Sequence, residues 1–152
     1  MLTITNAGQD DLEAICALLS AVGLSTDGVA EAMAGFLVAR EDGRVVAVAG
    51  LEDHGAAGVL RSVAVAPDRR NQRLGAELVA ALIDRSRQQG HRALYLLTNG
   101  AEGYFARFGF RRVGRDAVRP EVARSSQFGS EACTSSAVMV LEFGAGARTQ
   151  ED

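Results

Sequence analysis

The sequence predicts an α/β protein, folded as a single domain with a mixed central sheet of about six or seven strands flanked by helices. Short β-branched and apolar runs alternate along the chain with segments whose apolar residues recur at helical spacing. This alternation is typical of helices packed on one central sheet. The length of 152 residues is sufficient for one full hydrophobic core.

The expected elements follow from this patterning and from turn residues. An Asp-Gly pair at residues 42–43 predicts a hairpin, and Asp10 or Asp11 is expected to cap the first helix. Strands are expected over residues 2–6, 36–41, 45–52, 59–65, 93–98, 110–113 and 137–143, and helices over 12–22, 27–33, 74–89 and 101–108. Residues 1–143 form the expected domain, and the small, polar residues 144–152 are expected to be a disordered tail.

Composition argues against nucleic acid, a membrane and a metal ion as binding partners. A net charge of −3 and a pI near 5.4 argue against a nucleic-acid surface. No apolar run reaches the roughly 18 residues of a membrane span, and the first residues lack a signal-peptide pattern, so we expect a cytoplasmic protein. Cys16, expected in the core, and Cys133 form neither a disulfide framework nor a zinc pattern, and we expect no metal.

The stretch from Val63 to Ala76 carries the clearest functional signal. An apolar strand stops at Pro67, three arginines follow at 69, 70 and 73, and an amphipathic helix begins. A helix N-terminus leaves backbone N–H groups unpaired and carries partial positive charge, and arginine adds bidentate phosphate donors. We therefore expect this loop to bind a phosphate.

Three positions in this loop leave alternatives open. Arg69 is either a ligand or a solvated surface arginine. Asn71 tolerates left-handed backbone geometry better than most residues do. Arg73 is harder to accommodate, because its Cβ would crowd a pyrophosphate or its backbone would be strained.

Candidate residues for proton transfer and acceptor binding lie on the two strands before the loop. Glu52, at the end of one strand, is the best candidate for a general base, and its alternative is a solvated strand-end charge. Arg61 enters an otherwise apolar strand, so it either binds a substrate carboxylate or oxyanion, or pairs with Glu52 or Glu102. Ser62, a second catalytic candidate, should face the opposite way unless a bulge intervenes.

The residues over 60–76, 94–98 and 101–110 resemble the GCN5-related N-acetyltransferases (GNAT). The resemblance implies that the strand residues Val63, Ala64 and Val65 contact the pantetheine arm of acetyl-CoA and that the loop binds its pyrophosphate. The implied pyrophosphate ligands are Arg70, Asn71, Gln72, Arg73, Leu74, Gly75 and Ala76. Further cofactor contacts are implied for Thr98, Asn99 and Phe105. Many relatives carry a tyrosine at position 105, the presumed acid for the leaving thiolate, so the phenylalanine is a departure.

A narrower resemblance is to the arsenic-resistance-associated N-acetyltransferase subfamily, itself similar to the acetyltransferase part of N-acetylglutamate synthases. It rests on the Leu-Arg-Ser at 60–62, the Leu-Leu-Thr at 96–98, and Phe128 with Cys133 before the last strand. Relatives have proline after that cysteine, whereas this chain has Thr134. Cys133 either lines the acceptor pocket or is structural.

These observations predict an acetyl-CoA-dependent N-acetyltransferase that transfers directly to a small amine. The acceptor would be amino-acid-like or related to arsenic resistance. A catalytically weak acyl-CoA-binding regulatory module is the alternative. It is supported by Asn71 and Arg73, which stand where the family pattern has glycine, and by the missing tyrosine. An exposed edge of the final strand would be compatible with a homodimer.

Overall fold

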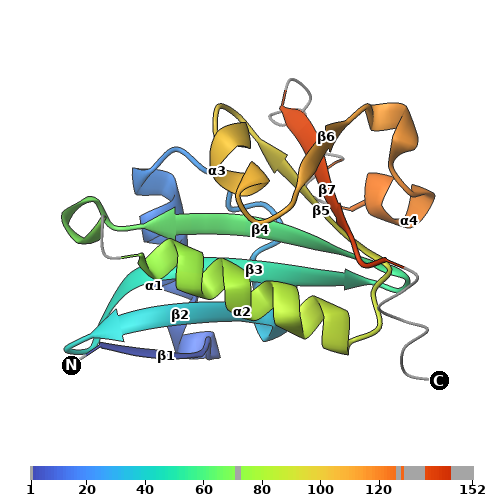
Figure 1. The fold of residues 1–152 in the computed structure, drawn as a ribbon. Coiled ribbons are helices and arrows are strands. Elements are labelled where there is room, and N and C mark those ends of the chain that lie inside the picture. Colours follow the sequence, from blue (N-terminus) through green and yellow to red (C-terminus); the bar gives the residue numbers. More distant parts are fainter. Residues whose placement is uncertain (1, 71–72, 126–127, 129–135, 145–152) are drawn as a thin grey trace. The chain divides into compact units, whose positions relative to one another are not determined.

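A computed structural model describes residues 2–70, 73–125, 128 and 136–144 (Figure 1). It confirms the α/β class, with an open, mixed, seven-stranded sheet in the order β1-β2-β3-β4-β5-β7-β6 and flanking helices. The chain forms two compact units, residues 1–52 with 60–82 and residues 53–59 with 83–152. Residues 145–152, which make up nearly all of the predicted tail, lie outside the described part.

The element boundaries agree closely with the sequence pattern. The strands are β1 (Leu2–Asn6), β2 (Phe36–Glu41), β3 (Arg44–His54), β4 (Ala57–Val65), β5 (Ala93–Thr98), β6 (Arg111–Val113) and β7 (Ala137–Glu142). The helices are α1 (Leu12–Ala21), α2 (Leu74–Gln88), α3 (Glu102–Ala106) and α4 (Pro120–Ala123), with 3-10 turns at Gln9–Asp11, Ala30–Gly35, Pro67–Arg69 and Arg115–Ala117. The α-helix predicted over residues 27–33 is therefore wrong in type, because the structure has a 3-10 turn at Ala30–Gly35 instead.

In the first unit, the predicted hairpin between β2 and β3 is confirmed. Asp42 and Gly43 both have left-handed backbone conformations, with φ of 53° and 82°. A two-residue turn with both residues in this region matches the right-handed twist of the flanking strands. Glu41 and Arg44 are consequently paired directly across the turn.

The core of the first unit lies between α1 and the sheet. Phe36 on β2 is fully buried, and a Cβ at Gly50 on β3 would come within 2.5 Å of its ring. Glycine at position 50 is therefore required for the ring to lie against β3. The other buried members of this core are Ile15, Leu19, Val29, Met33, Val38, Val48 and Ala64.

A buried acid ties the start of α1 to β2. The Asp11 carboxylate accepts hydrogen bonds from both terminal nitrogens of Arg40, at 2.6 and 2.7 Å, and from the Gly8 N–H at 2.8 Å. Asp11 is the N-cap residue of α1, as predicted, but its side chain makes no capping hydrogen bond to that helix. The hydrogen bonds from Arg40 hold the Asp11 pKa below its ordinary value, despite the opposing effect of burial.

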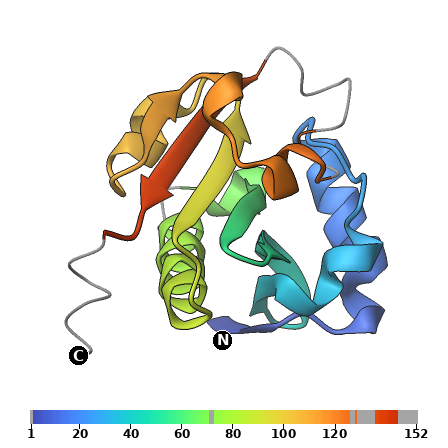
Figure 2. The same cartoon turned by 90° about the vertical axis from the view of Figure 1, so that its right-hand side faces the viewer.

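In the second unit, β5 pairs antiparallel with β7 along its whole length, from Ala93 opposite Glu142 to Thr98 opposite Ala137. Figure 2 shows these two strands side by side, in yellow and red. The first residues of β4 pair in parallel with β5 only from Ala57 to Val59. The buried core of this unit comprises Ala57, Val59, Ala93, Tyr95, Val122, Phe128, Val138 and Val140.

Replacing Asp11 by asparagine is expected to destabilise the protein by about 2 kcal/mol at pH 7, because two hydrogen bonds to a charged partner are lost. The folded Asp11 pKa is depressed, so its contribution is complete above the unfolded pKa and disappears as pH falls through the folded value. Urea unfolding of wild type and D11N at pH 7 and pH 3 should show a difference that shrinks in acid. D10N, at an exposed neighbouring aspartate, is the control; equal effects of both substitutions would contradict the assignment.

Candidate functional site

The loop that the sequence predicts to bind phosphate connects β4 to α2 within the first unit. Pro67–Arg69 forms a 3-10 turn, and Arg70 is extended. The Arg73 carbonyl accepts the first helical hydrogen bond from the Glu77 N–H at 3.0 Å, so α2 begins at Leu74. A 15-residue helix therefore presents its N-terminus directly after the arginines. Asn71 and Gln72, two of the predicted ligands, lie outside the described residues.

Ion pairs fasten the start of this loop to the β2–β3 hairpin. Asp68 accepts from both terminal nitrogens of Arg44, at 3.0 and 3.1 Å, and this lowers the Asp68 pKa. Arg69 donates to Glu41, and its Nη1 lies 3.2 Å from Asp68. The Arg69 guanidinium therefore binds carboxylates of the protein itself and is not a fully solvated surface group.

The remaining two arginines of the loop are exposed. Arg70 donates one long hydrogen bond, of 3.4 Å, to the Val65 carbonyl. Arg73 has a φ of 63°, so the backbone strain considered from the sequence is present at this position. Arg70 and Arg73 are the arginines of the loop whose charges are not matched by a nearby acid among the described residues. They can therefore hold an anion.

The last three residues of β4 differ in burial. Ala64 is buried in the core of the first unit, whereas Val63 and Val65 are half-buried. Leu74 and Gly75 are buried at the start of α2, and Ala76 is half-buried. The predicted cofactor contacts of these residues would be made by backbone groups.

Arg61 and Glu52 form a buried ion pair. Arg61 is 2% exposed, and its Nη1 donates to Glu52 Oε2 at 2.7 Å. Of the two alternatives left open by the sequence, the pairing with Glu52 is the one observed, so the Arg61 side chain has an internal partner. The solvated alternative for Glu52 is wrong, because this carboxylate is buried.

Ser62 breaks the alternation of β4. Its φ is 60°, a left-handed conformation inside a strand, and its hydroxyl accepts from Arg61 Nε at 2.9 Å. The sequence allowed Arg61 and Ser62 to lie on one side only if the strand was irregular, and the left-handed residue provides that irregularity. A third partner of Arg61, the Asp27 carbonyl at 2.6 Å, had no signal in the sequence because it is a backbone atom.

The remaining predicted residues lie in the second unit or outside the described part. Thr98 is half-buried at the end of β5, Asn99 is exposed, and Phe105 is buried on α3. Tyr104 packs edge-on against the Phe105 ring at 5.1 Å, and burial raises its pKa. Cys133 lies outside the described residues, and Cys16 is a partly buried free thiol packed against the first core.

The second unit contains a serine–histidine–aspartate chain that sequence reasoning missed. His91 Nδ1 lies 2.7 Å from Ser86 Oγ, and His91 Nε2 lies 2.9 Å from Asp53 Oδ1. Ser86 has no exposed surface, so its hydroxyl cannot meet a substrate. These hydrogen bonds therefore connect the end of β3 to the end of α2. The hydrogen bond from His91 also lowers the Asp53 pKa.

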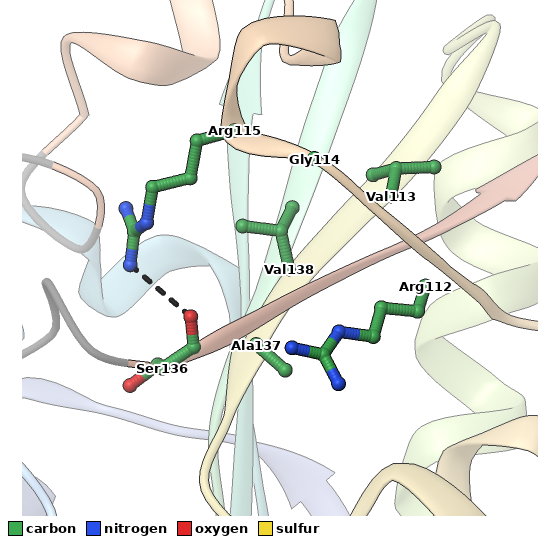
Figure 3. A pocket seen from close by; sticks show the side chains of 7 residues that line it. All are labelled: Arg112, Val113, Gly114, Arg115, Ser136, Ala137 and Val138. Carbon is green, nitrogen blue, oxygen red and sulfur yellow. Dashed lines mark hydrogen bonds between the residues drawn. The ribbon is translucent and has the colours of Figure 1, made fainter.

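A hollow of about 530 Å³ lies where β6 leaves β7 in the second unit (Figure 3). Arg112 and Arg115 flank it, with Ala137 and Val138 between them. Arg115 donates to the Ser136 carbonyl at 3.3 Å, and Arg112 lies 3.8 Å from Glu102. The hollow is basic at its rim, but both guanidinium groups already have partners.

Neither a membrane span nor a metal-ligand set is found in the described part of the chain. None of its helices combines the length and apolar character that crossing a membrane requires. No group of three or more histidine, cysteine, aspartate or glutamate side chains is gathered there in a way that would hold a metal ion.

Comparison with known proteins identifies the family. The model of the acetyltransferase (GNAT) family matches residues 16–110, which is well over half of the chain. The chain therefore belongs to the GNAT family of acetyltransferases. No curated protein sequence gives a significant match.

Solved structures agree with this assignment. Rv2747 from Mycobacterium tuberculosis, in complex with CoA, is 24% identical with a TM-score of 0.79, covering 93% of this chain and 99% of that one. N-acetylglutamate synthase from Neisseria gonorrhoeae, complexed with CoA and N-acetyl-glutamate, is 25% identical with a TM-score of 0.79; 95% of this chain spans 35% of that one. The ribosomal-protein-S18-alanine N-acetyltransferase from Escherichia coli is 20% identical with a TM-score of 0.71, covering 95% of both chains.

Replacing Arg73 by glycine is expected to stabilise the protein by about 0.5 kcal/mol. Relief of the left-handed strain should slightly exceed the entropy lost when glycine folds. R70G is the matched control, because the neighbouring arginine is extended with φ of −68° and should only lose stability. Urea unfolding of the two variants provides the comparison. Equal destabilisation by both would show that Arg73 is not strained.

Proposed function

We propose that the protein transfers an acetyl group from acetyl-CoA directly to the amine of a small acceptor. Family membership supports the reaction class. The observation that carries the cofactor assignment is the loop before α2, where Arg70, Arg73 and the helix N-terminus are available for an anion. The pyrophosphate of acetyl-CoA is such an anion, and Val63, Ala64 and Val65 would contact its pantetheine arm.

The chemistry requires a neutral amine and stabilisation of an oxyanion. The amine lone pair attacks the thioester carbonyl carbon, the carbon–sulfur bond breaks, and the CoA thiolate leaves and takes a proton from water. We propose that Glu52 accepts the proton lost by the amine, directly or through water. Ser62 is the second catalytic candidate in the first unit. Phe105 cannot protonate the thiolate, which is consistent with water as the proton source.

We propose an amino-acid-like acceptor, with an acceptor related to arsenic resistance as the narrower prediction of the sequence. The similar synthase from Neisseria gonorrhoeae was solved with N-acetyl-glutamate, which supports an amino-acid-like acceptor. The carboxylate-binding role predicted for Arg61 is not part of this proposal, because that side chain pairs with Glu52. The cofactor contacts of Thr98 and Asn99, the acceptor contact of Cys133, a cytoplasmic location and a homodimer stay predictions. The expected exposed edge of the final strand is wrong, because β7 pairs with β5 on one side and with β6 on the other.

The reaction is tested by titrating acetyl-CoA calorimetrically and then measuring free-thiol release across a panel of amines and amino acids. Acetyl-CoA should bind, and CoA should be released only when an acceptor is present. Binding without acceptor-dependent release would refute the enzyme and favour a catalytically weak acyl-CoA-binding module. Absence of binding would refute both.

The double variant R70A/R73A is expected to weaken acetyl-CoA binding about tenfold or more, because two charge-assisted contacts to phosphate are removed. The loss should diminish at high salt, since exposed charges are screened. R92A removes an exposed arginine outside the loop and should bind as wild type does. Calorimetry at two salt concentrations measures both effects. An unchanged affinity for R70A/R73A would place the pyrophosphate elsewhere.

Glu52→Gln is expected to lower kcat/KM for the acceptor about 100-fold, as loss of a general base does, while acetyl-CoA affinity changes little. Glutamine keeps an oxygen that can accept from Arg61, so the pairing geometry is retained. D53N, at the adjacent exposed aspartate, is the control and should stay within about threefold of wild type. Full activity of E52Q would exclude Glu52 as the base.

A further inference from the structure

The Arg61 guanidinium connects segments of the first unit that are far apart in sequence. It donates to Glu52 on β3, to the Ser62 hydroxyl on β4, and to the Asp27 carbonyl before the 3-10 turn Ala30–Gly35. Its central carbon also lies 5.9 Å from the centre of the Phe36 ring, within cation–π range. Each nitrogen of this side chain therefore has a partner in a fixed direction.

Stability alone does not explain this arrangement. Removing two charges from water costs several kcal/mol per ion, and an apolar pair of similar volume is often as stable or more stable. Most residues of β4 are apolar and buried, so a charged side chain at position 61 is a departure from the rest of the strand. The ion pair provides fixed directions for hydrogen bonds, which an apolar side chain cannot provide.

One of those directions affects the backbone of β4. Ser62 has φ of 60°, a left-handed conformation that is unfavourable for a non-glycine residue. The hydrogen bond from Arg61 Nε to its hydroxyl is available in this conformation and offsets part of that cost. A left-handed residue rotates the following peptide out of the regular pattern of the strand, so it determines where the Val63 N–H points.

We propose that Arg61 is a positioning residue for acetyl transfer, holding residue 62 in its left-handed conformation and the Glu52 carboxylate in one orientation. Through residue 62 it sets the backbone direction at Val63, where the thioester arm is proposed to bind. Through Glu52 it fixes the proposed proton acceptor. This inference rests on the proposed function, and it replaces the substrate contact predicted for Arg61 with an internal role.

Two pairs of variants test the proposal. S62A and S62G both lack the hydroxyl, but only glycine adopts φ near 60° freely, so S62A should lose about tenfold more kcat than S62G. R61K keeps the charge but loses the guanidinium geometry, and should lower kcat about 100-fold with acetyl-CoA Kd within about threefold. In the S62G background, R61K should cost about tenfold or less, because glycine no longer needs to be held.

The control is R40K, the same exchange at an ion-paired arginine of the first unit outside the candidate site. It should leave kcat and both KM values near wild type. Thermal unfolding of every variant checks that each is folded at the assay temperature. Equal losses in S62A and S62G, or the same R61K loss in both backgrounds, would overturn the proposal, since the hydroxyl or the charge alone would then be responsible.

A readout that does not need activity separates this inference from the proposed reaction. Amide hydrogen exchange at Val63 should differ in R61K from that in wild type and R40K, because residue 62 is released and the Val63 N–H changes direction. Wild type without acceptor-dependent CoA release would refute the reaction but not the positioning. Unchanged exchange at Val63 in R61K would refute the positioning while leaving the reaction intact.

Discussion

The buried charge of Arg61 is the constraint around which the first unit is organised. A guanidinium removed from water requires an acid and further acceptors, and the chain provides Glu52, the Ser62 hydroxyl and the Asp27 carbonyl. Phe36 lies against the same group, and its ring has room only because residue 50 is glycine. Residues from β2, β3, β4 and the segment after α1 are thereby fixed by a single side chain.

Backbone strain marks both ends of the functional segment. Ser62 precedes the strand residues proposed to contact the pantetheine arm, and Arg73 precedes the helix proposed to hold the pyrophosphate. Both have left-handed φ values although neither is glycine, and such residues persist where the surrounding structure holds them. The backbone therefore has a defined direction where it enters Val63 and where it enters Leu74. Such preorganisation reduces the entropy that binding must overcome.

Much of this could be predicted from the sequence, and the reasons for the failures are specific. β1, β2 and β5 begin and end at the predicted residues, because alternation and the Asp42–Gly43 turn are local signals. The partner of Arg61 remained one of several alternatives, since a charge in a strand shows that an acid is needed but not which one. The Asp27 carbonyl carries no side-chain signal at all. Asp11 occupies the predicted N-cap position of α1, but its carboxylate binds Arg40 instead of the helix. The sequence could not indicate this partner, because Arg40 lies 29 residues away.

The loop before α2 explains how an acidic protein can present a basic binding site. Four arginines lie in or beside this loop, and acids of the first unit neutralise two of them, with Arg44 bound by Asp68 and Arg69 bound by Glu41 and Asp68. These pairs hold the loop against the hairpin but contribute little net charge. Arg70 and Arg73 retain their charge beside the N-terminus of α2. The ion pairs thus hold residues 68 and 69 against the hairpin, and the two remaining arginines are the charges on which the proposed anion binding depends. Glycine at position 73 would relieve the left-handed backbone strain, but it would also remove one of those two positive charges. Arginine at this position therefore costs backbone strain and adds a charge for the proposed phosphate contact.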